Sequence, residues 1–486
     1  MGLLLPSCGN LESFFSSINE PNSSFSSECD HIVVIDKHKE ETCYEIGLTQ
    51  GSHCARCGKV FEKQEIIKPS HKYKLKNVHL NKVSDIEKAG DFDCVRCKKE
   101  VTKEITYEDI NMPIITVHGD LKSITKDKKT SLSIDYESEN HFSSTVTFKL
   151  QGSSSLAYPK KNYNIQFLDE NGKKKKVELN PSWSKQSKYC LKANYIDYTQ
   201  SRNVVSGKIY GDIVHSRNID DEISLLPNGG AIDGFLVLLY NNDSYLGLYT
   251  LNIPKDEWLF DMDSKESAIL MSKDWTKSVF LQEDIDESYS NGWENEYAGD
   301  DDQERVRVSF NKVMGEIRNG DLSHINVDRA IDSMLYSILI CARDNYSKNI
   351  LWITYDGINY LPSVYDLDST WGLNYDGKTF NKYDSCLVDE VLSSWNCNEL
   401  WKKLFELYPL KIADAYLSLR KGPLHLDNII NEFESFINRI DPALYKADGK
   451  KWPSIPSQKE NNLRQIKAFI VNRIGLFDSY FEEMKK

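Results

Sequence analysis

Apolar and polar residues alternate along several stretches of the first half of the chain, with the two-residue period of a half-buried strand. The clearest runs are residues 145–150 and 159–167, which flank the loop Gln151-Gly152-Ser153-Ser154-Ser155. Further strands are expected at residues 188–194, 232–240 and 244–252. The pattern therefore predicts a strand-rich first half.

From about residue 305 onward the apolar spacing becomes helical, with Ala330, Met334 and Ile338 on one helix face. The apolar stretch 334–342 is too short to cross a membrane, which takes about 18–20 apolar residues, so we expect a buried helix there. No longer apolar run follows or precedes it. Strands followed by helices indicate an α+β fold with two lobes.

The composition excludes one class of partner. The 486 residues are 40% hydrophobic and 27% charged, as in an ordinary globular protein. Lys and Arg number 60 against 73 Asp and Glu, which gives a net charge of -13. Because nucleic-acid binding requires a basic surface, we exclude nucleic acid as the main partner.

Two Cys-x-x-Cys knuckles, Cys54 with Cys57 and Cys94 with Cys97, stand in similar surroundings near the N-terminus. Each is followed by a short alternating run, so this region is expected to be a small β module. Four thiolates suit a tetrahedral Zn²⁺, and we expect the two knuckles to share one ion.

Two alternatives to a shared site stay open. Residues 29–71 resemble a short module repeated on surface proteins of gut-type anaerobic bacteria, recognisable by Cys43 and the run from Gly47 to Cys54. Each repeat could then bind its own ion with help from Cys29, His31, Cys43 or His71, or the cysteines could pair as disulfides.

The N-terminal sequence Leu3-Leu4-Leu5-Pro6-Ser7-Cys8 is similar to the end of a bacterial lipoprotein signal, and a Ser/Asn-rich spacer follows to Ser27. We expect a lipid on Cys8 to tether the chain to the extracellular face of a bacterial cell. The alternatives are a secreted or spore-surface protein, or a polar leader in which Cys8 is incidental.

Two β-type runs, residues 350–355 and 358–365, flank the turn signal Asp356-Gly357. In a two-residue hairpin centred there, Asn349 lies opposite Val364. The residues just outside the hairpin are then expected to meet at its open end.

These outer residues carry hard oxygen ligands: Asp344, Asn349, Asp366 and Asp368. Clustered carboxylates repel each other unless a cation lies among them, and oxygen ligands with phosphates suit Mg²⁺ or Mn²⁺. The order Arg343-Asp344, Asn349, then Asp366-x-Asp368 also matches a phosphoryl-transfer site, in which one Asp accepts a proton and the others hold metal. The simpler alternative is a structural Ca²⁺ loop or a solvent-facing acidic turn.

The strand–loop–strand around Gly152, Ser153 and Ser154 can wrap phosphates with backbone N–H and hydroxyl donors. Lys160 and Lys161 enter the second strand and could place a positive charge on the phosphate oxygens. Lys192, on a later strand, is the second candidate for the nucleotide-positioning lysine. An ordinary hairpin turn is the simpler interpretation of the loop.

Several motifs in this order resemble the CotH kinases, a family named for a bacterial spore-coat protein and also found among surface and secreted proteins. They are Gln151-Gly152-Ser153-Ser154, Tyr158-Pro159-Lys160-Lys161-Asn162-Tyr163, Asn194-Tyr195-Ile196-Asp197 with Arg202-Asn203, Asp233-Gly234-Phe235, residues 245–251, Asp344-Asn345, Lys348-Asn349 and Tyr365-Asp366-Leu367-Asp368. The resemblance runs from about Met112 to the closing helix at residues 466–481.

The resemblance implies an atypical protein-kinase-like fold that binds ATP with a divalent metal and phosphorylates Ser or Thr on secreted or surface proteins. By position, Lys161 is then the nucleotide lysine, Asp344 the catalytic aspartate, and Asn349 and Asp366 metal ligands, with Asp368 as a further metal contact. Where many family members have an acidic residue that anchors the lysine, this chain has residues 252–256, Asn-Ile-Pro-Lys-Asp. Glu283, Glu294 or Glu296 are the alternative anchors.

We therefore expect three segments: a signal remnant and linker at 1–27, a Cys-x-x-Cys repeat region at 28–110, and a CotH kinase-like domain at 111–486. The expected function is metal-assisted transfer of phosphate from ATP to Ser or Thr of a surface protein. The alternative is a catalytically silent adhesin or cell-wall interaction protein with the same fold.

Overall fold

The computed structural model describes residues 29–273, 283–289, 291–394 and 397–486. Contacts divide the chain into two compact units. We call residues 29–74 and 93–100 the knuckle unit, and the described residues among 75–92 and 101–486 the large unit. Residues 75–92, expected in the N-terminal module, thus group with the large unit, where the N–H of Tyr245 donates to the carbonyl of Leu80.

The knuckle unit consists of short antiparallel strands. One sheet has the order β1-β3-β4 and a second pairs β2 with β5. The bounds are β1 Val33–Asp36, β2 Gly47–Leu48, β3 Gly51–Cys54, β4 Val60–Glu62 and β5 Ile66–Ile67. A third sheet has the order β6-β7-β8, with β6 at Tyr73–Val78, β7 at Ala89–Cys94 and β8 at Glu100–Glu104. A single turn of helix, α1 at Tyr107–Ile110, follows.

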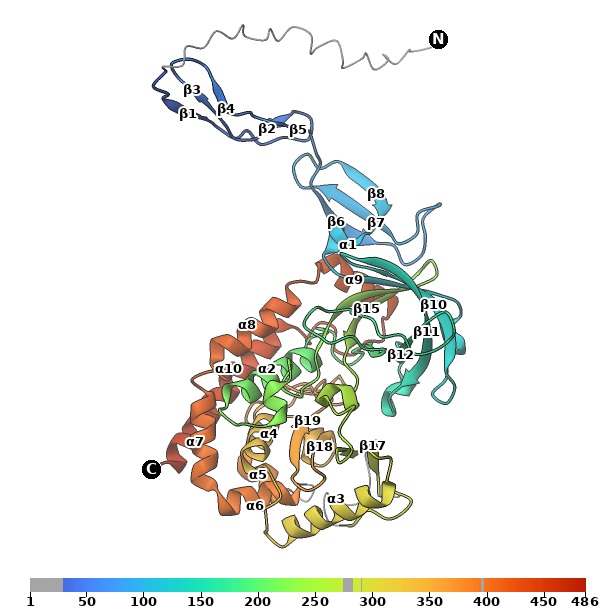
Figure 1. Cartoon of the computed structure of the whole chain (residues 1–486), viewed down its shortest axis with the longest axis vertical. Helices are drawn as coiled ribbons and strands as arrows, with labels where there is room; N and C mark the ends of the chain where they lie inside the picture. Colours follow the sequence, from blue (N-terminus) through green and yellow to red (C-terminus); the bar gives the residue numbers. More distant parts are fainter. Residues whose placement is uncertain (1–28, 274–282, 290, 395–396) are drawn as a thin grey trace. The chain divides into compact units, whose positions relative to one another are not determined.

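A closed barrel with the order β10-β11-β12-β13-β15-β14-β9 forms the strand-rich part of the large unit (Figure 1). Its strands are β9 Ile114–His118, β10 Thr130–Glu137, β11 His141–Gln151, β12 Asn162–Leu168, β13 Lys188–Lys192, β14 Gly234–Asn241 and β15 Ser244–Asn252. All neighbours are antiparallel except β14 and β9. The five strands predicted between residues 145 and 252 all lie in this barrel, as β11 to β15.

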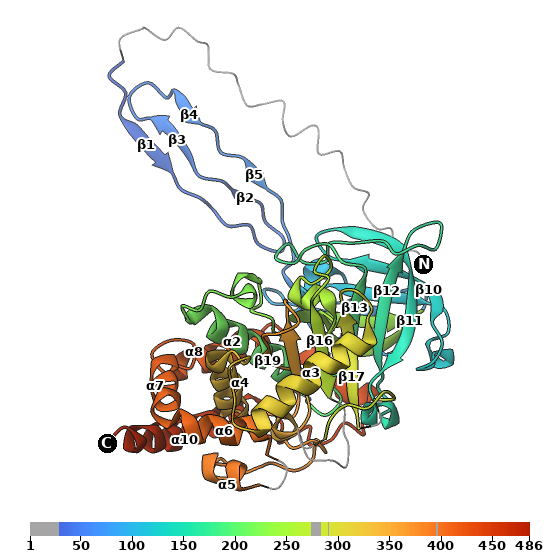
Figure 2. The ribbon, with the colours of Figure 1, turned by 60° about the horizontal axis from the view of Figure 1, so that its bottom comes forward.

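A second sheet follows, with the order β17-β16-β18-β19. Its strands are β16 Ile269–Lys273, β17 Trp293–Ala298, β18 Ile350–Thr354 and β19 Leu361–Val364. Helix α3, Gln303–Arg318, packs on β17, and Figure 2 shows it crossing this sheet. Phe310 of α3 lies 4.8 Å from the ring of Trp293 and 5.7 Å from that of Trp352, so aromatic packing fixes the helix.

The hairpin of β18 and β19 differs by one residue from the predicted register. Ile350, not Asn349, pairs with Val364. The cause is the turn: Asp356 accepts hydrogen bonds from the N–H groups of Ile358 and Asn359, both at 2.8 Å, which widens the loop beyond two residues. Asn349 still lies at the open end, where its carbonyl accepts from the N–H of Tyr365 at 3.0 Å.

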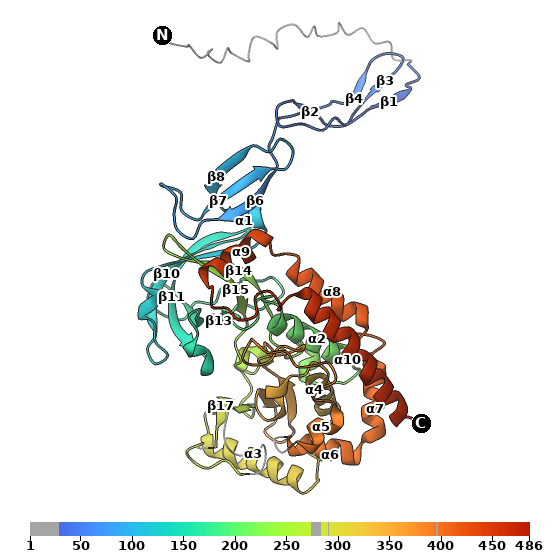
Figure 3. The ribbon, with the colours of Figure 1, turned by 180° about the vertical axis from the view of Figure 1, so that it is seen from behind.

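Helices make up most of the remaining large unit. They are α2 Arg202–Ser216, α4 Val327–Leu339, α5 Val388–Ser393, α6 Glu399–Leu407, α7 Pro409–Leu419, α8 Leu426–Ile437, α9 Pro442–Lys451 and α10 Leu463–Met484. The long α10 packs along α7 and α8 (Figure 3), and α9 packs on β15 of the barrel. Among the described helices, none is both long and apolar enough to cross a membrane.

The predicted α+β class is confirmed: strands dominate the first half and helices the second. Helix α4 includes most of the apolar stretch 334–342 and is buried along its whole length except at its first residues. The closing helix extends a few residues beyond both predicted ends, from Leu463 to Met484. Its start is fixed by Asn462, which caps it by accepting from the N–H of Gln465.

Candidate functional site

The open end of the β18–β19 hairpin brings together the segments that carry Asp344, Asn349 and Asp366. The buried amide of Asn345 joins them, donating to the carbonyls of Asn349 at 2.9 Å and Tyr365 at 3.2 Å. Asn349 and Asp366 both have left-handed backbones, with φ of 57° and 55°. Asn and Asp tolerate this conformation, and such residues concentrate at functional sites. Asn345 belongs to the Asp344-Asn345 motif noted in the sequence, but the sequence pattern assigns it no role of its own.

Lys192 reaches this acidic group from β13. Its Nζ lies 3.9 Å from Oδ1 of Asp366, with the lysine side chain 14% and the aspartate side chain 37% exposed. Desolvation and the negative charge of Asp366 raise the pKa of Asp368 well above its usual value, and Asp344 adds to the effect. Carboxylates that disfavour each other's ionisation in this way fit a site for a cation.

These oxygens do not close around an ion by themselves. Within the described part of the chain, only two Cys/His groups place three or more ligand atoms within 4.8 Å of one another. An open set of oxygens suits Mg²⁺ or Mn²⁺, which keep water ligands and share phosphate oxygens with a nucleotide.

Asp344 lies on a short 3₁₀ turn, Arg343–Tyr346, directly before Asn349. Its carboxylate is 35% exposed and pairs with Nζ of Lys348 at 3.1 Å. It is therefore accessible to a hydroxyl from outside.

The Gly/Ser loop folds into a 3₁₀ turn at Ser154–Ala157. Gly152 has a φ of 109°, and a Cβ there would lie 1.9 Å from Oγ of Ser155, so only glycine fits. Ser153 and Ser154 are exposed and free to meet a ligand. Lys161, half-buried, donates from Nζ to the carbonyl of Leu156 at 2.6 Å, which places its charge at this loop.

Lys160 lies elsewhere. Its ammonium is fully buried, 2.9 Å from Oδ1 of Asp448 on α9 and 2.6 Å from the carbonyl of Leu248. This geometry differs from the predicted phosphate contact, because an ammonium with these buried partners does not face a nucleotide. Both lysines lie in the bend before β12, where Lys160 turns towards α9 and Lys161 towards the Gly/Ser loop.

The proposed anchors Glu294 and Glu296 pair with a lysine that the sequence did not assign. Nζ of Lys255 lies 2.6 Å from Glu296, 3.4 Å from Glu294, and 5.3 Å from the ring centre of Tyr365, the residue before Asp366. The sequence does mark Lys255, because this residue lies within residues 252–256, where the chain departs from the family pattern. The third candidate, Glu283, acts on Lys273 instead: its negative charge opposes the lowering of the Lys273 pKa that burial causes.

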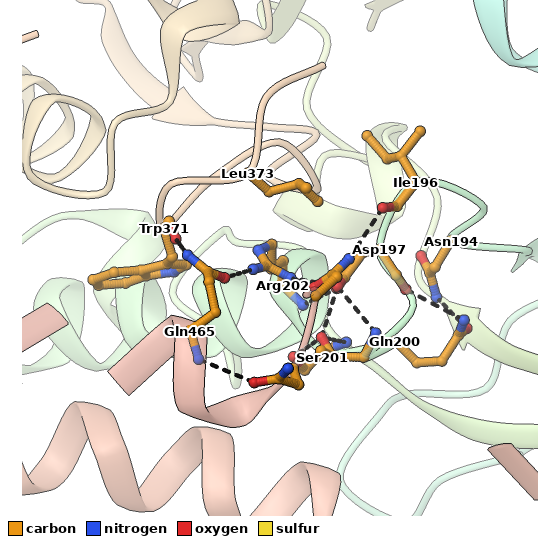
Figure 4. A network of polar contacts seen from close by, with 12 residues as sticks. Asn194, Ile196, Asp197, Gln200, Ser201, Arg202, Trp371, Leu373 and Gln465 are labelled. Carbon is orange, nitrogen blue, oxygen red and sulfur yellow. Dashed lines mark hydrogen bonds and ion pairs between the residues drawn. The ribbon is translucent and has the colours of Figure 1, made fainter. Parts of the chain in front are cut away.

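A buried network ties the Asp-x-Asp segment to α2 (Figure 4). Arg202 donates to Asp197 at 2.5 Å, to the carbonyl of Thr370 at 2.9 Å and to Gln465 at 2.6 Å. Asn203 accepts from the N–H of Leu367 at 2.9 Å. These residues hold the segment that carries Asp366 and Asp368 without entering the site.

The cysteines of the knuckle unit form two groups, which corrects the expectation of one shared site. One comprises Cys29, His31, Cys54 and Cys57, and the other Cys43, His71, Cys94 and Cys97. Burial opposes ionisation of Cys54, yet the N–H of Cys57 and the ring of His31 lower its pKa to about 5. No disulfide bond joins the cysteines of either group in the structure.

Comparison with known protein families identifies a match for the large unit. The family model described as "CotH kinase protein" matches residues 148–476, which is more than half of the chain and includes the Gly/Ser loop, Lys192 and the hairpin end. A search of curated proteins finds no match.

Proposed function

This chain belongs to the CotH kinase family, and on that premise we propose that it transfers the γ-phosphoryl group of ATP to Ser or Thr of secreted or cell-surface proteins. The family supports kinase chemistry and ATP with a divalent metal. The observation that carries the finer proposal is the meeting of Lys192, Asn349 and Asp366 at the end of the hairpin. The barrel and the helical part would act as the two lobes of a kinase-like fold.

In this proposal Asn349, Asp366 and Asp368 hold Mg²⁺ or Mn²⁺. The metal would neutralise charge on the nucleotide phosphates. Asn349 and Asp366 have left-handed backbone conformations, and Asn345 fixes that of Asn349 by donating to its carbonyl. The oxygen ligands are therefore positioned before any nucleotide arrives.

We assign the phosphate-positioning charge to Lys192 rather than to Lys161. The ammonium of Lys192 lies beside the carboxylate of Asp366. The ammonium of Lys161 instead donates a hydrogen bond to the carbonyl of Leu156 in the Gly/Ser loop. Lys161, with Gly152, Ser153 and Ser154, would cover the phosphates from the loop side. Asp344 would accept the proton of the acceptor hydroxyl, as its partial exposure allows.

The test is transfer of label from γ-labelled ATP with Mn²⁺ or Mg²⁺ to the chain itself and to a generic acidic protein. Asp366→Asn and Asp344→Asn should each lower transfer by about 100-fold or more. Asp384→Asn, an exposed carboxylate in the same half of the chain, is the control and should keep full activity. Equal transfer by the wild type and both site variants would contradict the assignment.

A second assay separates the alternatives. If the wild type transfers no label and ATP with Mn²⁺ does not raise its melting temperature, the silent adhesin or cell-wall interaction protein replaces the kinase. A melting shift that Lys192→Met abolishes and Lys161→Met retains would support the lysine assignment even with an unknown acceptor.

For localisation we propose the extracellular face of a bacterial cell, with a lipid on Cys8, as the N-terminal sequence suggests. Cys8 lies outside the described residues. Cell fractionation with labelled palmitate should show label on the wild-type precursor and none on Cys8→Ala. Unlabelled protein in the medium or on spores would instead support a secreted or spore-surface protein.

A further inference from the structure

We propose that the knuckle unit holds two structural zinc ions in separate sites, each made of three thiolates and one histidine. We call Cys29, His31, Cys54 and Cys57 the first zinc site, and Cys43, His71, Cys94 and Cys97 the second zinc site. This proposal is independent of the kinase reaction, since all eight residues lie outside residues 148–476.

The distances fit a tetrahedral ion. Zinc bonds of about 2.3 Å to sulfur and about 2.0–2.1 Å to nitrogen separate two sulfurs by about 3.8 Å and sulfur from nitrogen by about 3.5 Å. In the first site Sγ of Cys29 and Sγ of Cys54 are 3.9 Å apart, and Sγ of Cys57 is 3.4 Å from Nδ1 of His31.

The second site repeats these values. Sγ of Cys43 and Sγ of Cys94 are 3.5 Å apart, and Sγ of Cys97 is 3.4 Å from Nδ1 of His71. A disulfide needs about 2.05 Å between sulfurs and leaves no role for a histidine. The same ring nitrogen faces the thiolates in both sites, so both histidines would bind through Nδ1.

The knuckles themselves are built for a metal-bound thiolate. The N–H groups of Arg56 and Cys57 point at Sγ of Cys54, at 3.4 and 3.5 Å. Such N–H donors stabilise negative charge on the sulfur and fix its direction. With four protein ligands each, the sites leave no open position, which is typical of structural rather than catalytic zinc.

The packing of the knuckle unit provides the second argument. Among its described residues the buried apolar side chains are Cys43, Cys54 and Cys94, while aliphatic and aromatic side chains such as Ile35, Val60 and Phe61 are exposed. So little buried apolar surface does not stabilise a segment of this size. Small domains that lack a sufficient hydrophobic core use metals or disulfides. The ions would replace a hydrophobic core.

The two sites also interlock. His31 and His71 lie at the same spacing before their knuckles. The second repeat lacks a counterpart of Cys29, because Pro69 occupies that position. Cys43, from within the first repeat, fills the gap in the second. The second zinc site therefore ties the first repeat to the second knuckle.

Native mass spectrometry of the full chain, purified with reductant and zinc, should show two Zn²⁺ per chain. Cys57→Ser and Cys97→Ser should each reduce this to one, while His38→Ala, an exposed histidine of the same unit outside both sites, should keep two. One ion per wild-type chain that both cysteine variants abolish would support a shared site and overturn the proposal. No ion, with a mass lowered by two hydrogens per cysteine pair in a parallel preparation without reductant, would indicate disulfides and also overturn it.

A ligand variant could unfold the whole knuckle unit and lose both ions. Titration of the metal-free wild type with Co²⁺ decides that case. Two equivalents should develop thiolate charge-transfer and tetrahedral ligand-field bands, and saturation at one equivalent would contradict two sites. Failure of the kinase assay would leave this result unaffected, because the readout is metal content.

Discussion

Lys160 and Lys161 are neighbours in the chain but have opposite environments. Lys160 points into the interior and pairs with Asp448, with 0% and 1% of the two side chains exposed. Burial lowers the pKa of Lys160 and raises that of Asp448, while each charge opposes the shift of the other. A pair of this kind is costly to break on one side only.

We predict that Lys160→Met lowers the melting temperature strongly, with a cost of about 3–5 kcal/mol, because it leaves Asp448 buried without its counter-charge. Lys161→Met, at the adjacent half-buried position, should have little effect on melting. Thermal unfolding measures both. The double variant Lys160→Met/Asp448→Leu should recover much of the loss; equal melting of single and double variants would contradict the pairing.

Asp332 of α4 makes the free energy of unfolding depend on pH. Its side chain is 0% exposed, and burial raises its pKa to about 7 although Arg217 lies 3.2 Å away. The folded state therefore binds this proton more tightly than the unfolded state, whose aspartate has a pKa of about 3.9. The contribution to stability is largest at low pH and falls as pH rises to about 7.

We predict that the melting temperature of Asp332→Asn, relative to that of the wild type, rises between about pH 4 and pH 7. Above about pH 7 this difference should stay constant, because Asp332 is then ionised in both states of the wild type. Melting across this pH range measures the effect. Asp414→Asn, with a side chain 62% exposed, should show no such trend. A difference that is flat with pH would mean that Asp332 is not the titrating group.

At the scale of elements, the first turn of α2 fixes the loop after β19. Asn203 accepts from Leu367, which lies between Asp366 and Asp368, and Arg202 holds the carbonyl of Thr370. The helix thus sets the direction of the two carboxylates that we propose as metal ligands, through the backbone between them. Asn203 and Arg202 are positioning residues in the proposed reaction.

We predict that Asn203→Ala raises the Mn²⁺ concentration for half-maximal transfer by about 10-fold, in the range seen when residues that orient metal ligands are removed. Transfer at saturating Mn²⁺ should recover towards the wild-type rate, which a general loss of folding would not allow. Asn472→Ala, on exposed α10 surface, is the matched control. An unchanged metal dependence would remove Asn203 from this role.

At the scale of the molecule, the two units rely on different sources of stability. The large unit buries aromatic and aliphatic side chains, including Trp293, Trp352 and Trp371. The knuckle unit buries only thiols among its described apolar side chains. Loss of metal should therefore affect one unit and spare the other.

We predict that a zinc-selective chelator in excess Mg²⁺ makes the knuckle unit, residues 29–74 and 93–100, sensitive to limited proteolysis while the described residues of the large unit resist. Mass mapping of the fragments locates the cuts. The resistant fragment should keep its melting temperature within about 2 °C, since it contains its own core. Cuts spread evenly over both units would show that the two units do not differ in this way.

The sequence by itself determined the features that depend on local spacing. The two-residue period located five of the seven barrel strands, β11 to β15, with residues 244–252 matching β15 at both ends, and the helical period located α3 and α4. The turn signal at Asp356 was sufficient to place Asn349 and Asp366 at one end of a hairpin, even with the register one residue off. These features need only neighbouring residues, so the pattern contains them.

Tertiary structure alone decided which distant residues meet. Lys160 and Asp448 are 288 residues apart, so no spacing relates them. The same holds for Lys255 with Glu296, for Lys192 with Asp366, and for Cys43 with the second knuckle. A side chain's charge and its ligand atoms are fixed by its identity, but its partner is chosen by the packing of elements, which the linear order does not specify.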